Sequence, residues 1–79
     1  MKVNKSVAIS ESGFLFDAMS GDSYSLNPIA AEILEMIREQ KSMEEIKQEL
    51  LKKYDVTPTL LDKSVDEYIF TLKKLNILK

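Results

Sequence analysis

The chain has 79 residues, of which 44% are hydrophobic and 30% charged, and its formal net charge is −2. At roughly 150 residues per domain, this length predicts one small domain over residues 1–79 with a thin core. The sequence contains neither cysteine nor histidine. This excludes disulfides, thiolate nucleophiles, imidazole general bases and Ser-His-Asp arrangements. We therefore expect no enzyme activity, no metal site and no cofactor.

Two features of the sequence bear on where in the cell the protein is located. The first five residues, Met1 to Lys5, lack the apolar stretch of a signal peptide. The longest uncharged run, residues 24–31, is too short to span a bilayer. We expect a cytoplasmic protein that does not bind membranes.

The first third of the sequence has an apolar period of two, which is typical of short, half-buried strands. The alternating apolar side chains form three groups, which are Val3, Val7 and Ile9, then Phe14 and Phe16, then Tyr24 and Leu26. The two glycines, Gly13 and Gly21, fall in the intervening polar turns, where a positive φ is often required. The pattern predicts an antiparallel meander with strands at about 2–9, 13–17 and 22–26.

From Asn27 onward the apolar period becomes helical. Asn27-Pro28 and Thr57-Pro58 each combine an N-cap residue with a proline at the first helical position. Ser42 with Glu45 forms a capping box. Three helices are therefore predicted, the last about 17 residues long, with Asn76 at its C-terminal cap and Ile77-Leu78 packing back. The expected buried stripe of each helix is Ile29, Ala30, Ile33, Leu34 and Ile37, then Met43, Ile46, Leu50 and Tyr54, then Leu61, Val65, Tyr68, Leu72 and Leu75.

This order of elements predicts an α+β domain, a three-stranded meander followed by three helices. A small sheet beside three helices also describes winged helix-turn-helix proteins, so a DNA-binding regulator is an alternative. Residues 58–79 carry only a +1 balance, and no arginine lies in the second or third predicted helix. Recognition helices usually present Arg, Asn or Gln to base edges. We therefore expect no nucleic-acid binding.

Paired carboxylates are the remaining candidates for chemistry. Glu32 with Glu35, and Asp62 with Asp66, have spacings that place two carboxylates on one helix face. Such pairs are more typical of a solvated helix surface than of a metal or proton site. The turn from Asp17 to Asp22 lacks the ligand spacing of an EF-hand and is read as a hairpin turn.

Two features instead predict contact with another chain. On the third helix Phe70 lies about 140° around from Val65 at 100° per residue, off the buried stripe and beside Asp66, Ile69 and Lys73. An exposed Phe there favours a contact surface. The last strand, Asp22-Ser23-Tyr24-Ser25-Leu26, is expected at a sheet edge, with Tyr24 and Leu26 facing inward. It contains no Lys or Pro to prevent pairing, so it is suited to strand addition.

The residues in order then resemble those of a known family. The runs Phe14-Leu15-Phe16-Asp17 and Tyr24-Ser25-Leu26-Asn27-Pro28, separated by Gly21, resemble the PqqD family. So do Ser42 to Ile46, Tyr54-Asp55-Val56 and the terminal Leu75-Asn76-Ile77-Leu78. The resemblance covers about residues 7 to 78. The sequence has Asn76 where the family commonly has glycine, and it lacks the aromatic residue often found at position 23.

The resemblance implies a RiPP recognition element, which binds the leader segment of a ribosomally made precursor peptide without catalysis. It implies that the leader docks as an added strand between the third strand and third helix, and is presented to a modifying enzyme such as a radical-SAM maturase. The resulting candidate peptide-binding residues are Asp22, Ser23, Tyr24, Ser25, Leu26, Asp66, Ile69, Phe70 and Lys73. A structural subunit or regulator that has lost peptide binding is a third possibility.

Overall fold

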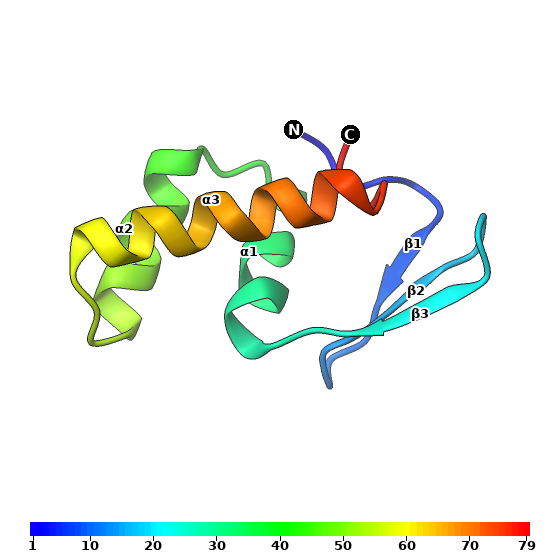
Figure 1. Ribbon diagram of the computed structural model, residues 1–79, viewed down its shortest axis with the longest axis horizontal. Coiled ribbons are helices and arrows are strands. Elements are labelled where there is room, and N and C mark those ends of the chain that lie inside the picture. Colours follow the sequence, from blue (N-terminus) through cyan, green and yellow to red (C-terminus); the bar gives the residue numbers. More distant parts are fainter.

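The computed structural model describes residues 1–79, and its elements follow the predicted order. Three strands, β1 (Val7–Ile9), β2 (Phe14–Asp17) and β3 (Asp22–Ser25), precede three helices, α1 (Pro28–Arg38), α2 (Met43–Lys53) and α3 (Pro58–Lys74). The strands form an antiparallel sheet in the order β1-β2-β3. The sheet occupies one end of the molecule, and α3 runs along much of its length (Figure 1). The predicted α+β meander-plus-helices fold is confirmed. None of the helices is long and apolar enough to cross a membrane.

The helices begin where the capping residues place them. The side chains of Asn27, Ser42 and Thr57 each accept a hydrogen bond from the backbone N–H three residues later. The capping box is complete, because Glu45 also accepts from the Ser42 N–H. This hydrogen bond from the Ser42 backbone is the main reason that the pKa of Glu45 lies below its ordinary value. Local capping thus sets all three helix starts.

Two helices end in a Schellman motif without glycine. After α3, Asn76 has φ 61° and its N–H donates to the Lys73 carbonyl, while the Ile77 N–H donates to Leu72. After α1, Gln40 takes the same left-handed conformation, with φ 65°. The predicted cap at Asn76 is confirmed, and the turn that it makes buries Ile77 and Leu78 completely or nearly so.

The prediction of one first strand over residues 2–9 was wrong. The segment divides into two, because a turn closed by the Val7 N–H to the Asn4 carbonyl interrupts it. Before the turn, Val3 forms an antiparallel bridge with Leu78, flanked by the hydrogen bonds Asn4 N to Ile77 O and Lys79 N to Lys2 O. The two chain ends therefore lie side by side (Figure 1). Lys5, which breaks the apolar alternation in the sequence, lies in this turn.

The inward face of β2 is the opposite of the one that its two phenylalanines indicate. Leu15 is fully buried and Asp17 is buried, whereas Phe14 and Phe16 are exposed. The strand alternates with a period of two, as predicted. However, Phe14 and Phe16 face outward, because Leu15 alone fills the space under the sheet. Asp17 is tolerated inside because its Oδ1 accepts hydrogen bonds from the Ser6 hydroxyl and the Met19 N–H.

One hydrophobic core joins the inner face of the sheet to the three helices. Its members come from every element except β3, which contributes the half-buried Tyr24. Leu75, predicted in the buried stripe of α3, is 37% exposed because the Schellman turn begins there and Ile77 takes the inner position. The buried core consists of Val7, Leu15, Ile33, Leu34, Met36, Ile37, Ile46, Leu50, Leu61, Val65, Leu72, Ile77 and Leu78.

Candidate peptide-binding site

The free edge of β3 presents backbone groups in a defined order. The Leu26 N–H donates to the Gly13 carbonyl, and the register pairs Tyr24 with Leu15. In an antiparallel pair, residues that exchange hydrogen bonds alternate with residues that do not. Tyr24 and Leu26 therefore direct their backbone groups toward β2, and Ser23 and Ser25 direct theirs away from the sheet. Side-chain and turn hydrogen bonds reach Asp22 and Leu26, but none reaches the backbone of Ser23 or Ser25.

The opposite edge of the sheet, at β1, is engaged at Val7. The Val7 N–H donates to the Asn4 carbonyl, and the Val7 carbonyl accepts from the Arg38 guanidinium at 3.3 Å. At Val7 this edge is therefore unavailable to an incoming strand, whereas Ser23 and Ser25 leave the β3 edge open.

A groove lies between β3 and the C-terminal end of α3. It has a volume of about 720 Å³, and Asp22 and Tyr24 line it from the strand, while Lys74 and Leu75 line it from the helix end. The Asn27 side chain donates a hydrogen bond to the Tyr68 hydroxyl, which ties the segment after β3 to α3. The open strand edge and the groove are therefore adjacent features of one surface.

Tyr24 forms the half-buried wall of this groove. Its ring packs against the core. Burial, and then the nearby carboxylates of Asp22 and Asp17, raises the pKa of its hydroxyl above the ordinary value. The phenol is therefore neutral across the physiological pH range and can donate a hydrogen bond to a bound segment. The predicted inward orientation of Tyr24 and Leu26 is confirmed, since both pack against the core while Ser23 and Ser25 are exposed.

Phe70 is exposed, as predicted, with 68% of its surface accessible. It lies in a shallow hollow on α3 with Lys63, Asp66, Glu67 and Thr71. Lys74 follows Phe70 by one helical turn and lines the groove, but Phe70 itself does not line it. Phe70 is therefore an exposed apolar side chain beside Asp66, which pairs with Lys47 of α2.

The other candidate residues of α3 lie toward α2. Asp66 forms an ion pair with Lys47 of α2 at 3.6 Å, and Asp62 pairs with the same lysine at 3.4 Å. Ile69 is half-buried and packs against the core. Lys73 is exposed in the last turn of α3, where its charge complements the helix dipole. The groove beside β3 is thus not lined by any of the four predicted residues of α3, which are Asp66, Ile69, Phe70 and Lys73.

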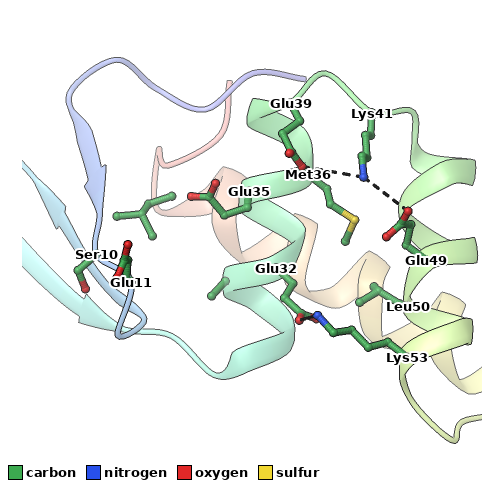
Figure 2. A pocket seen from close by; sticks show the side chains of 12 residues that line it. Ser10, Glu11, Glu32, Glu35, Met36, Glu39, Lys41, Glu49, Leu50 and Lys53 are labelled. Atoms are coloured by element: carbon green, nitrogen blue, oxygen red, sulfur yellow. Dashed lines mark hydrogen bonds and ion pairs between the residues drawn. The ribbon is translucent and has the colours of Figure 1, made fainter.

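Figure 2 shows a separate cavity of about 480 Å³ between α1, α2 and the β1–β2 turn. Its carboxylates are largely engaged by lysines, since Lys41 pairs with Glu39 and Glu49, and Lys53 pairs with Glu32. Hydrogen bonding to Glu32 raises the pKa of Lys53 and of Tyr54. These pairs join α1 to α2, so we assign the cavity a structural role.

Comparison with known proteins bears directly on this arrangement. The family described as Coenzyme PQQ synthesis protein D (PqqD) matches residues 12–78. The chain belongs to the PqqD family. The matched region contains β2, β3 and all three helices, and with them both walls of the groove. No curated protein gives a significant match.

Two solved structures share the fold of this PqqD-family chain. The structure described as TbiB1 in complex with the TbiA(beta) leader peptide has a TM-score of 0.92 at 20% identity, and the match covers 100% of this chain and 95% of that one. The structure described as lasso peptide synthetase B1 complexed with the leader peptide has a TM-score of 0.83 at 25% identity, with 96% and 93% covered. The predicted family and fold are thereby confirmed.

Several residues that line the groove of this PqqD-family domain are not among the predicted binding residues, including Met19, Lys74 and Leu75. The sequence pattern predicts Leu75 in the buried stripe of the third helix, and Met19 within the hairpin turn from Asp17 to Asp22. Met19 is 84% exposed and lines the groove together with Ser20. The Schellman turn at Asn76 is the one sequence signal that could have indicated that Leu75 leaves the buried stripe.

Proposed function

We propose that this chain is a non-catalytic domain that binds the leader segment of a ribosomally made precursor peptide and presents it to a modifying enzyme. The segment adds to β3 as a fourth strand, and its inward side chains enter the groove beside α3. Membership of the PqqD family supports this proposal. So do the two similar structures, both described as complexes with leader peptides.

The observation that carries the proposal is the pair of unsatisfied residues on β3. Ser23 and Ser25 offer two N–H donors and two carbonyl acceptors at one edge, next to a groove. Backbone hydrogen bonds of this kind provide affinity in strand addition, and alternate side chains provide specificity. The proposed binding residues are Asp22, Ser23, Tyr24, Ser25 and Leu26 on the strand side, and Asp66, Ile69, Phe70 and Lys73 on the helix side, to which the structure adds Lys74 and Leu75.

Non-catalytic binding is supported by the side chains that the chain contains. It has no histidine or cysteine, and in the cavity between α1 and α2 Glu49 and Glu32 pair with Lys41 and Lys53. The modifying chemistry is accordingly assigned to a partner enzyme.

The alternative of a DNA-binding regulator is not favoured. The outer surface of α3 carries three acids and three lysines, and Lys47 of α2 is neutralised by Asp62 and Asp66. A surface that binds phosphates needs unpaired cations, and its affinity falls steeply with salt. The protein should pass through a heparin column at moderate salt.

Proline substitution at β3 tests the proposal. Candidate leader segments, taken from short peptides encoded in the same genome, are titrated by calorimetry. Ser23→Pro and Ser25→Pro each remove an outward N–H, so we expect native circular dichroism and loss of binding. Ser23→Ala and Ser25→Ala keep the N–H and should bind as the wild type does.

Two further variants check the assigned direction of the backbone groups. Tyr24→Pro removes an N–H that faces β2 and should damage the fold. Asp22→Pro removes a donor that bonds to the Ser20 hydroxyl, so it should disturb the turn. Folded Ser23→Pro and Ser25→Pro variants that bind the leader normally would rule out strand addition at this edge.

A further inference from the structure

The outer face of the sheet, which is turned away from the helices, carries two large exposed rings. Phe14 and Phe16 are 58% and 47% exposed, and they lie two residues apart on the central strand. Exposed apolar groups gathered in one place are unusual on a small soluble domain and mark contact surfaces. Neither ring contributes to the core, and neither faces the groove beside α3.

The register arranges this face in two rows of three residues. In one row Phe16 lies between Ala8 of β1 and Ser23 of β3, and in the other Phe14 lies between Ser10 and Ser25. Every flanking side chain is small and exposed. The two rings therefore form a ridge along β2 with a low shelf on each side. A hollow on this face is lined by both rings together with Ala8 and Ser23.

The two shelves differ in what can lie beyond them. Beyond the Ala8 shelf, Arg38 occupies the Val7 carbonyl of the β1 edge. Beyond the serine shelf the β3 edge is open. A strand that pairs with β3 must place every second side chain on the outer face, about 4.8 Å beyond the serines. Because Ser23 and Ser25 have small side chains, a large side chain on that strand can extend across them and contact Phe14 or Phe16.

We infer that the outward side chains of the bound peptide cover Phe14 and Phe16. The inference rests on the proposed function and specifies its ligand. The segment that this domain selects has apolar residues at two positions i and i+2 that face the ridge, in addition to the intervening residues that face α3. Recognition therefore uses both faces of the added strand, and the small side chains of Ser23 and Ser25 provide the room for it.

The arrangement of charges is consistent with an apolar occupant on this face. Ala8, Ser10, Phe14, Phe16, Ser23 and Ser25 are all uncharged. The acids and lysines of this end of the molecule lie instead in the turns and in the groove, as with Asp22 and Lys74. A charged side chain on the outer face of the peptide would find no partner there, whereas an apolar one removes exposed ring surface from water.

Peptides selected from a displayed library of random 16-residue sequences provide the probe. Peptides are selected on the wild-type protein, and those that lose binding to Ser23→Pro but not to Ser23→Ala are kept, because they depend on the β3 amide. Each position of one such peptide is then changed to serine and titrated against two proteins, the wild type and the double variant Phe14→Thr/Phe16→Thr. Threonine favours strands, so the double variant should keep the fold, which circular dichroism verifies.

The expected result is that the double variant becomes insensitive to serine at one set of peptide positions, those that face Phe14 and Phe16 in the wild type. On the wild type, serine at two peptide positions two residues apart should weaken binding about 10-fold, and on the double variant by less than about 2-fold. The intervening positions should stay sensitive on both proteins. Leu60→Ala, which removes a comparably exposed apolar side chain near the start of α3, should leave the pattern of the wild type unchanged.

Three outcomes would overturn the inference. If the double variant binds the selected peptides within about 2-fold of the wild type, peptide side chains do not cover the ridge, and the proposed function still stands. If the wild type sediments as a dimer and the double variant as a monomer without peptide, a second copy covers this face instead. If no selected peptide depends on the Ser23 amide, the proposed strand addition fails and the inference fails with it.

Discussion

Arg38 donates a hydrogen bond from its Nη2 to the carbonyl oxygen of Val7 at 3.3 Å, and this contact makes the two edges of the sheet unequal. Arg38 is the last residue of α1, so the helix that follows β3 in the chain closes the edge at β1. The same guanidinium pairs with Glu35 at 3.7 Å, which holds it in place. The contact thereby occupies the Val7 carbonyl at one edge, whereas the backbone groups of Ser23 and Ser25 stay open at the other.

Removing the hydrogen bond from Arg38 to Val7 should lower the stability of the fold without affecting peptide binding. Arg38→Ala leaves the Val7 carbonyl without a protein partner, and we expect the free energy of unfolding to fall by about 0.5–1.5 kcal/mol. Urea denaturation measures the change. Lys52→Ala, which removes an exposed cation from α2, is the control and should change stability by less than about 0.5 kcal/mol. Equal effects of the two substitutions would show that the contact to Val7 does not matter.

Asp17 should make stability depend on acid pH. The Ser6 hydroxyl, and then the Met19 N–H, holds the pKa of Asp17 below its ordinary value of 3.8. A folded pKa below the unfolded one means that this stabilisation is complete above about pH 4 and is lost as pH falls through the folded pKa. We expect the stability difference between wild type and Asp17→Asn to shrink steadily below pH 4.

Urea denaturation from pH 2 to pH 7 measures that difference. Glu45, whose pKa is also lowered, titrates in both proteins and cancels in the comparison. Ser6→Ala removes the main donor and should reduce the same acid dependence. A stability difference that stays constant between pH 2 and pH 7 would contradict the assigned role of Asp17.

Gln40 occupies a backbone conformation that suits glycine. Its φ of 65° lies in the left-handed region, where a long side chain is disfavoured. Gln40→Gly should raise the free energy of unfolding by about 0.5–1 kcal/mol, and Gln40→Val should lower it. Asn76→Gly is the matched comparison at the end of α3 and should change stability less, because asparagine already tolerates this conformation. Thermal unfolding that ranks Gln40→Gly below the wild type would refute the strain.

The sequence predicted the helices and the inward face of β3, with Tyr24 and Leu26, but it did not predict the buried face of β2. The helix starts can be predicted from Asn27, Ser42 and Thr57, because N-capping depends only on neighbouring residues. Which face of β2 is buried depends on the space that the helices leave, and Leu15 fits that space where two phenylalanines do not. A period of two is the same for either face, so the sequence pattern could not choose between them.

The candidate site was predicted in outline for a similar reason. The edge position of β3 follows from the order of the elements, so Ser23 and Ser25 were identified correctly as edge residues. Which side of α3 faces β3 depends on the rotation of the helix about its axis. Asp62 and Asp66 pair with Lys47, so the side of α3 that carries them faces α2. Tertiary packing of this kind has no local signature.

Phe70 should matter for binding and not for folding. Because the ring is 68% exposed, Phe70→Ala should change the free energy of unfolding by less than about 0.5 kcal/mol while weakening leader binding by about 1–2 kcal/mol. A buried phenylalanine would instead cost about 3–5 kcal/mol of stability. Leu60→Ala removes another exposed apolar residue near the start of α3 and should leave binding unchanged. A large fall in melting temperature for Phe70→Ala would refute the surface assignment.

Amide hydrogen exchange at β3 tests strand addition most directly, because it reports on the N–H groups themselves. In the free protein, the amides of Tyr24 and Leu26 face β2 and should exchange slowly, whereas those of Ser23 and Ser25 face solvent and should exchange fast. Saturating leader peptide should slow exchange at Ser23 and Ser25 by at least about 10-fold and leave the other two nearly unchanged. If both serine amides exchange as fast in the complex as in the free protein, the leader does not add to β3.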